Sequence, residues 1–122
     1  MMEEKRTLVL GASPKVERFS NQAVVKLKKH NIPVFAVGLR EGEIDGVKIE
    51  KPFPDLHGIH TITLYVGAKN QPFYYDFILR LNPRRVIINP GAESDEFEKL
   101  LTEKGIDVIR GCTLIMLSKG TF

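Results

Sequence analysis

TLVLGASPKVER, residues 7–18, is the stretch that decides the fold. Thr7–Leu10 has the composition of a buried strand, and the small residues Gly11, Ala12 and Ser13 follow it as a turn. The next segment, residues 20–30, has the apolar spacing of an amphipathic helix. In open α/β sheets, a strand that leads through a small-residue turn into a helix forms a cradle for phosphate. The stretch therefore predicts an α/β protein with a phosphate-bearing ligand.

The remainder of the chain continues this alternation of strands and helices. Residues 38–57 are rich in glycine and proline and are predicted to be mostly loop, with 47–49 as a candidate edge strand. With right-handed crossovers, the pattern predicts a Rossmann-like α/β fold, with a doubly wound parallel sheet of five strands in a three-layer α/β/α arrangement. The predicted strands are 7–11, 34–37, 61–66, 85–88 and 107–110, and the predicted helices are 20–30, 70–82, 94–105 and 113–117, with Ser20, Asn70 and Ser94 as N-caps.

Length and composition narrow the functional classes. A chain of 122 residues is expected to form one domain, residues 1–122. The net charge of +3 is spread without a basic stripe or interleaved aromatic residues, so we expect no nucleic-acid partner. No segment approaches the ~20 apolar residues of a membrane helix, so we expect no membrane association. The single cysteine, Cys112, allows no internal disulfide bond, and no signal peptide is recognised, which together predict a cytoplasmic location.

The candidate site residues follow from the predicted topology. In a doubly wound sheet the ligand lies at the carboxyl ends of the strands, near the switch in strand order. Small residues predominate in the loops at those ends, so the backbone can approach a ligand closely. Lys15, Arg18 and Arg40 add positive charge to the same edge. We therefore predict a small-molecule nucleotide site built from residues 11–13, 38–40, 66–69 and 89–93.

The first loop departs from the dinucleotide fingerprint G-x-G-x-x-G. Its three positions read Gly11, Ser13 and Val16, so only the first glycine is present. The acid that would hold a ribose 2′-hydroxyl after the second strand is also missing, which disfavours NAD. Arg40 stands there instead, and a guanidinium suits a ribose that carries an additional phosphate. Coenzyme A and NADP both have that feature, so both remain open.

Four motifs, in order, resemble the small CoA-binding proteins: GASPKVERFSNQ, VFAVGLREGEIDGVKI, INPGAES and a final GCTLI. These proteins look like the nucleotide-binding domain of the succinyl-CoA synthetase alpha subunit, and the resemblance covers about Thr7 to Leu117. It implies that the ligand is coenzyme A or an acyl-CoA. The implied phosphate loop and helix start comprise Gly11, Ala12, Ser13, Arg18, Ser20 and Asn21. Near the adenosine and its 3′-phosphate it implies Gly38, Leu39, Arg40, Val66 and Gly67, and along the pyrophosphate or pantetheine arm Asn89, Gly91, Ala92 and Glu93.

No catalytic constellation is evident in the sequence. His57 and His60 have no third ligand nearby for a metal, and Ser13 has no histidine partner. Cys112 is interpreted as a packed, inert thiol, with contact to the pantetheine end as the alternative. We therefore assign no reaction. An NADP-dependent reductase, an acyl-CoA ligase partner subunit and a regulatory or oligomerising module that has lost the ligand are the other hypotheses, and a homo-oligomer or an unknown protein partner stays open.

Overall fold

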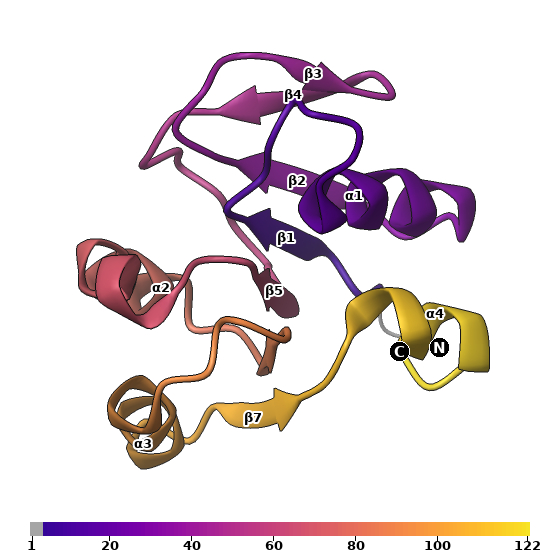
Figure 1. Ribbon diagram of the computed structural model, residues 1–122. Helices are drawn as coiled ribbons and strands as arrows, with labels where there is room; N and C mark the ends of the chain where they lie inside the picture. The colour runs from indigo at the N-terminus through magenta and orange to yellow at the C-terminus, as the bar shows by residue number, and fades with distance from the viewer. Residues whose placement is uncertain (1–3) are drawn as a thin grey trace.

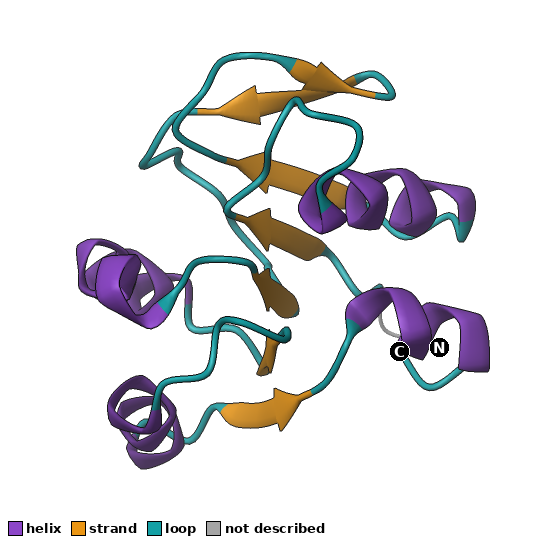
Figure 2. Cartoon of the chain, in the orientation of Figure 1, coloured by secondary structure: helices purple, strands orange, loops and turns teal. Residues whose placement is uncertain are grey.

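The computed structural model describes residues 4–122 as a mostly parallel sheet with helices on both sides (Figures 1 and 2). The strand order is β3-β4-β2-β1-β5-β6-β7, so the chain moves outward from β1 in both directions. This arrangement is the Rossmann-like α/β fold that the alternation of strands and helices predicts. The strands are β1 (Thr7–Leu10), β2 (Val34–Val37), β3 (Glu43–Ile44), β4 (Val47–Glu50), β5 (Thr61–Leu64), β6 (Arg85–Ile88) and β7 (Asp107–Arg110).

The sheet has seven strands, so the prediction of five is wrong. The two additional strands, β3 and β4, form a hairpin in the region predicted to be mostly loop. Asp45 and Gly46 both have positive φ, at 48° and 84°, as a tight two-residue hairpin turn requires. β4 pairs in parallel with β2, opposite Ala36 and Val37, and β3 pairs with β4 in antiparallel fashion. The strand predicted at 47–49 is therefore present as β4, but its expected place at the sheet edge is wrong, because β3 pairs with its outer side.

The structure has one of the three predicted helix N-caps. At the start of α3, Ser94 is the N-cap, and its Oγ accepts a hydrogen bond from the Phe97 N–H at 3.3 Å. The other two predicted caps are wrong. The first helix begins at Phe19 with Arg18 as its N-cap, and Asn70 lies inside a 3₁₀ helix. The helices are α1 (Phe19–Lys29), η1 (Ala68–Tyr74), α2 (Tyr75–Leu81), α3 (Asp95–Glu103) and α4 (Thr113–Lys119).

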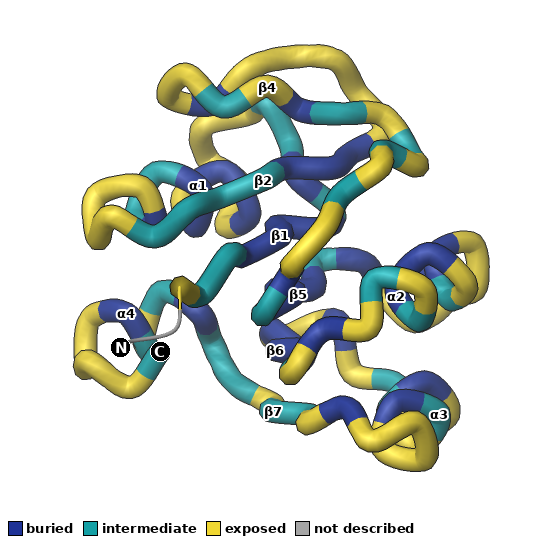
Figure 3. The backbone as a smooth tube through the Cα atoms, turned by 180° about the vertical axis from the view of Figure 1, so that it is seen from behind, coloured by how far each residue is buried: buried dark blue, intermediate teal, exposed yellow. Residues whose placement is uncertain are grey.

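Two hydrophobic clusters lie on opposite faces of the sheet. In Figure 1, α1 and α4 cover one face, and α2 and α3 cover the other. Residues of β1 alternate between them: Leu8 and Leu10 pack toward α2 and α3, and Val9 packs toward α1 and α4. Figure 3 shows buried backbone along β1, β5 and β6, in the middle of the sheet. The ends of these central strands position the candidate site.

The helices are short. The longest, α1, has 11 residues. Across residues 4–122, no helix has the length and apolar character that crossing a bilayer requires.

Candidate ligand cleft

A two-lobed cleft lies at the carboxyl ends of the central strands. The first lobe, about 630 Å³, is bordered by the loops after β1 and β2 and by the segment from Tyr65 to Tyr74. The second lobe, about 330 Å³, is bordered by the loop after β1, the start of α1 and the loop after β6. Gly11, Ser13 and Tyr65 line both lobes, so the two lobes adjoin at the end of β1. The cleft therefore occupies the edge of the sheet where the topology predicts a ligand.

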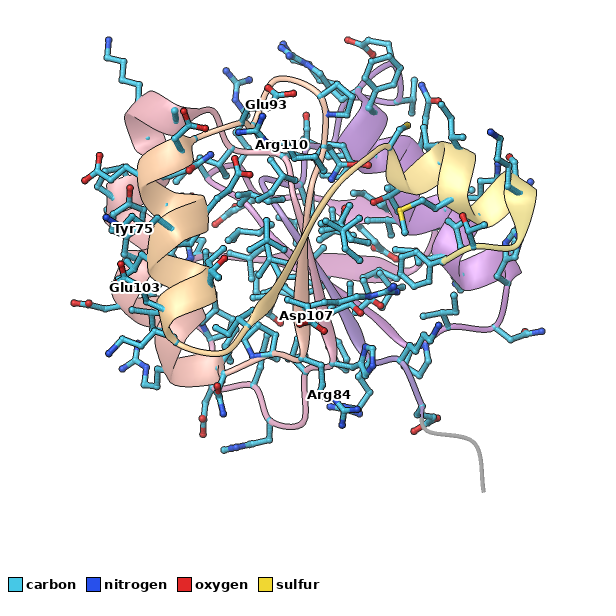
Figure 4. The ribbon with its side chains drawn as sticks, turned by 90° about the horizontal axis from the view of Figure 1, so that it is seen from below. Tyr75, Arg84, Glu93, Glu103, Asp107 and Arg110 are labelled. Carbon is cyan, nitrogen blue, oxygen red and sulfur yellow. The ribbon has the colours of Figure 1, made fainter. Side chains whose placement is uncertain are left out.

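Figure 4 separates the two edges of the sheet. Glu93 and Arg110 are labelled at one edge, which is the carboxyl end of β6 and β7. Arg84 and Asp107 are labelled at the opposite edge, where those strands begin. The cleft lies at the first of these edges, because its second lobe includes Gly91 in the loop after β6.

The loop after β1 owes its shape to two close backbone approaches. Gly11 has a φ of 94°, and a Cβ there would lie 2.9 Å from the Tyr65 carbonyl oxygen. A Cβ on Gly38 would lie only 2.1 Å from the Ala12 carbonyl oxygen. The N–H groups of Gly11 and Ala12 both donate to the Val37 carbonyl at 2.9 Å. These two amides are therefore engaged within the protein, and a phosphate in this cleft would need donors from other groups.

The start of α1 provides such groups. The N–H groups in the first turn of any helix have no intrahelical acceptor. In α1 no side chain supplies one, because the N-cap residue Arg18 makes no capping hydrogen bond. Arg18 and Ser20 line the second lobe beside them. Asn21 is buried, and its Nδ2 donates to the Ser13 carbonyl at 3.0 Å, which ties the loop to the helix. An uncapped helix N-terminus next to an arginine favours an anion.

The first lobe combines exposed apolar side chains with two cations. Leu39 is 73 % exposed and Phe73 is 60 % exposed, and they come from different elements that border the same lobe. Arg40 and Lys69 also line it. Phe73 packs against Phe53, with ring centroids 5.1 Å apart, and against Tyr74, at 5.0 Å. The lobe therefore offers an apolar surface, supported by neighbouring rings, with positive charge at its border.

Tyr65 separates the two lobes. Burial raises the pKa of its phenol to about 12, the nearby Thr63 and Thr113 hydroxyls oppose that shift, and Cys112 adds to it. The phenol is therefore neutral at physiological pH and serves as a wall of the cleft rather than as a base.

Comparison with known families and structures identifies the chain more closely. The family described as the CoA binding domain matches residues 5–118. The chain belongs to this CoA-binding domain family. No curated protein sequence matches it significantly.

Solved structures share the fold of this CoA-binding domain. A crystal structure of an uncharacterized protein is 45% identical, covers 99% of this chain and 100% of its own, and superposes with a TM-score of 0.95. A hypothetical protein from Pyrococcus horikoshii OT3 is 25% identical over 95% of this chain and 83% of its own, with a TM-score of 0.83. A protein from Thermus thermophilus, 23% identical over 97% of this chain and 91% of its own, has a TM-score of 0.82 and shares the fold.

Most of the residues predicted from the sequence line the cleft of this CoA-binding domain. They are Gly11, Ala12, Ser13, Arg18, Ser20, Leu39, Arg40, Val66, Gly67, Gly91 and Ala92. The remaining predicted residues lie outside its lining: Lys15, Asn21, Gly38, Asn89 and Glu93.

These outlying residues shape the cleft from behind or beside it. Lys15 is exposed, and its N–H donates to the Ser13 Oγ at 3.2 Å. Asn89 is buried; its Nδ2 donates to Thr63 Oγ1 at 2.7 Å and its Oδ1 accepts from the Thr113 N–H at 2.9 Å. The carboxylate of Glu93 accepts from the Gly91 N–H at 2.9 Å. Their contacts hold neighbouring loops in place.

The sequence prediction missed several residues that line the cleft. Tyr65, Phe73 and Tyr74 read as core or surface aromatics in the periodic pattern. The signal for them was the position of Tyr65, directly after a core strand, where residues tend to line a ligand site. In the structure β5 ends at Leu64, and η1 begins three residues after Tyr65, at Ala68. The full set of missed lining residues is Pro14, Phe19, Tyr65, Asn70, Phe73 and Tyr74.

Cys112 and the histidines lie apart from this lining. Cys112 is half-buried at the start of α4, close enough to Tyr65 to influence its pKa. His57 lies 3.2 Å from Asp55, and the His60 ring nitrogen Nδ1 lies 2.7 Å from Thr61 Oγ1. Over residues 4–122, no three His, Cys, Asp or Glu side chains are grouped to hold a metal ion.

Proposed function

We propose that this member of the CoA-binding domain family binds coenzyme A or an acyl-CoA in the two-lobed cleft. The ligand is a nucleotide with an aromatic base at one end, phosphates in the middle and a long, mostly neutral arm at the other end. The cleft offers matching chemistry: an apolar first lobe with Arg40 and Lys69, and a smaller second lobe with Arg18 and the uncapped start of α1. Family membership supports the same ligand.

The proposal rests on the cationic side chains of the cleft, which have no ion-pair partners among the described residues. Arg40 and Lys69 line the first lobe and Arg18 lines the second. None of the three makes an ion pair or a side-chain hydrogen bond with any residue from 4 to 122. By contrast, Lys51 pairs with Glu41 at 3.2 Å, outside the lining of either lobe. Three cations without carboxylate partners around one cleft favour a ligand with several phosphates.

The chemistry of the lobes suggests how the ligand is oriented. The adenine would contact Phe73 and Leu39 in the first lobe, and its 3′-phosphate would meet Arg40 and Lys69. The diphosphate would lie at the N-terminus of α1 near Arg18, and the pantetheine arm would pass along residues 90–92. We assign no reaction, because the chemistry of these groups is that of binding.

Calorimetry with coenzyme A, dephospho-CoA, NADP and NAD tests the proposal. We expect coenzyme A to bind most tightly and dephospho-CoA about tenfold more weakly, because it lacks the 3′-phosphate that a charge-assisted hydrogen bond would stabilise. Arg40→Ala should remove most of that difference. Arg80→Ala is the matched control, since Arg80 is an exposed cation in the last turn of α2, outside the lining of either lobe.

The alternatives predict different results in the same experiment. A preference for NADP would favour the reductase hypothesis. Binding of none of the four ligands would contradict the proposal and favour a module that has lost its ligand. Equal binding of coenzyme A and dephospho-CoA would refute the role of Arg40.

A fluorescence experiment tests the adenine end separately. The chain contains no tryptophan, so Phe73→Trp introduces a single reporter in the first lobe. Stacking of adenine on the indole should quench its emission. Phe19→Trp, in the second lobe, is the matched control and should respond more strongly to coenzyme A than to adenosine 3′,5′-bisphosphate, which lacks the pantetheine arm. Equal quenching of both reporters by the bisphosphate would contradict the proposed orientation.

A further inference from the structure

Gln71 connects the walls of the two lobes. It lies on η1, and its side chain has no solvent exposure. Its side-chain Nε2 donates to the carbonyl oxygens of Val66, at 2.8 Å, and Ala92, at 2.6 Å. Val66 lines the first lobe, in the segment after β5, and Ala92 lines the second, in the loop after β6. One amide group therefore holds one backbone segment from each lobe.

The other end of the same side chain has no partner. Among the described residues, no donor reaches the buried Gln71 Oε1. A buried acceptor without a hydrogen bond is destabilising, so packing alone is a poor explanation for a glutamine here. Because both of its neighbours at Nε2 are carbonyl acceptors, the NH₂ group must face them. The position of Gln71 is therefore explained by the two segments that it joins.

We propose that Gln71 is a positioning residue that fixes the separation of the two lobes. The inference rests on the proposed function, in that the ligand spans both lobes. With Val66 and Ala92 bound to the same nitrogen, a ligand that reaches from one lobe to the other meets a preset distance. Such a ligand binds more tightly than its separate halves, because once one half is bound the other half has a high effective concentration at its own lobe. This gain in affinity requires a fixed distance between the two lobes.

Binding of whole and divided ligands tests this role. Gln71→Met keeps the approximate shape of the side chain and removes both donors. We expect coenzyme A to bind at least about tenfold more weakly to this variant, because the advantage of linked binding is reduced. Adenosine 3′,5′-bisphosphate and 4′-phosphopantetheine, which each occupy one lobe, should change by less than about twofold. Equal weakening of all three ligands, or unchanged binding of coenzyme A, would overturn the proposal.

Gln22→Met is the matched control. Gln22 is an exposed glutamine on α1, and its Nε2 contacts only the Glu17 carbonyl, at 3.4 Å. It lies outside the lining of both lobes, so this variant should bind all three ligands as the original protein does. If Gln71→Met does not fold, Gln71→Asn replaces it, since its amide is one methylene shorter and cannot reach both carbonyls.

Hydrogen exchange of the ligand-free protein tests the connection without a ligand. Loss of the Gln71 donors should accelerate exchange at residues 66–70 and 90–94 together, because each segment loses a contact that limits its opening. Faster exchange confined to 68–74 would overturn the positioning role. This measurement distinguishes the two proposals: if the original protein binds no coenzyme A, the proposed function fails, while the exchange data still decide whether Gln71 joins the two segments.

Discussion

The two faces of the sheet hold the helices in different ways. The face under α2 and α3 is an apolar core that includes Leu64, Ile78 and Phe97. The face under α1 and α4 has a smaller apolar cluster and a set of buried hydrogen-bonded side chains that we call the polar seam: Thr63, Asn89 and Thr113. The alternation of side chains along β5 sends Thr61 and Thr63 to one face and Ile62 and Leu64 to the other.

The difference assigns separate tasks to the two faces. Apolar packing is strong but non-directional, and it stabilises the fold without fixing any one atom closely. The polar seam is directional: Asn89 bonds to β5 through Thr63 and to the start of α4 through the Thr113 N–H. Tyr65, which lines both lobes of the cleft, lies on the face with the polar seam. We therefore expect the apolar face to dominate stability and the polar seam to hold one wall of the cleft.

Phe97→Ala should have the largest effect on stability. The Phe97 ring is fully buried and stacks on Tyr75, with centroids 4.5 Å apart. Its removal leaves a cavity in the apolar core and should reduce the free energy of unfolding by about 3–5 kcal/mol. Chemical denaturation measures this change, with the exposed Phe73→Ala, expected to cost below about 1 kcal/mol, as control. A loss below about 1 kcal/mol for Phe97→Ala would refute the assignment of stability to this face.

Asn89→Leu should be the next most damaging change. The variant leaves the Thr113 N–H and the Leu64 carbonyl without their Asn89 partners, which lie at 2.9 and 3.0 Å. Loss of partners for buried polar groups should cost about 2 kcal/mol in the free energy of unfolding. Hydrogen exchange should also quicken at the start of α4. The exposed Asn70→Leu serves as control, and equal effects of the two substitutions would remove the distinction between the faces.

Much of the fold could be predicted because short stretches of the sequence carry the patterns of its strands and loops. Apolar runs such as Val34–Val37 and the small residues after them mark the strands and loops of a Rossmann-like sheet. The strand count was wrong because β3 is only two residues long, and pairing with β4 rather than its own composition makes it a strand. The Asp45-Gly46 turn was its signal in the sequence.

The candidate cleft was predicted in outline for the same reason. The strand ends and glycines in the sequence indicated which loops form the cleft, but periodicity cannot show which aromatic residues line it. Phe73 has the apolar character of a core residue, yet η1 leaves it 60 % exposed at the first lobe. Ser20 was predicted as an N-cap from residue type alone. The helix begins earlier, and Asn21 instead secures the loop through the Ser13 carbonyl, a contact between residues eight positions apart.

Tyr65, on the face with the polar seam, should make the stability of the protein depend on pH in the alkaline range. Burial raises its pKa to about 12 in the folded protein, against 10.0 for an ordinary tyrosine. The folded state therefore holds this proton more tightly than the unfolded state. The resulting contribution to stability is complete below pH 10 and is lost as the pH rises toward 12.

Tyr65→Phe should accordingly flatten the decline in unfolding free energy over that pH range. Ultraviolet titration should show the loss of one late-titrating phenol, while the raised pKa values of Tyr74 and Tyr75, each due first to burial, remain. An unchanged pH profile would show that Tyr65 is not confined against the polar seam.

The smallest effect should come from a polar network that lies on the solvent side of α3, outside the apolar face. Arg110 donates from Nε to Glu98 Oε1 at 2.7 Å and also contacts Asp95 at 2.8 Å. The hydrogen bond from Arg110 is the main cause that lowers the pKa of Glu98. The stabilisation that follows is present above the ordinary carboxyl pKa of 4.5 and is lost as the pH falls through the lowered value.

Arg110→Met should therefore raise the pKa of Glu98 toward 4.5, as carboxyl chemical shifts in an NMR titration would report. Its effect on unfolding at neutral pH should be much smaller than that of Asn89→Leu, because the Arg110 side chain is 52 % exposed and solvent screens its charge. Lys99→Met, an exposed cation on the same helix, is the control and should leave the Glu98 titration unchanged. If Arg110→Met destabilised the protein as much as Asn89→Leu, burial would not be what gives the polar seam its strength, and the contrast between the two faces would have to be restated in terms of charge.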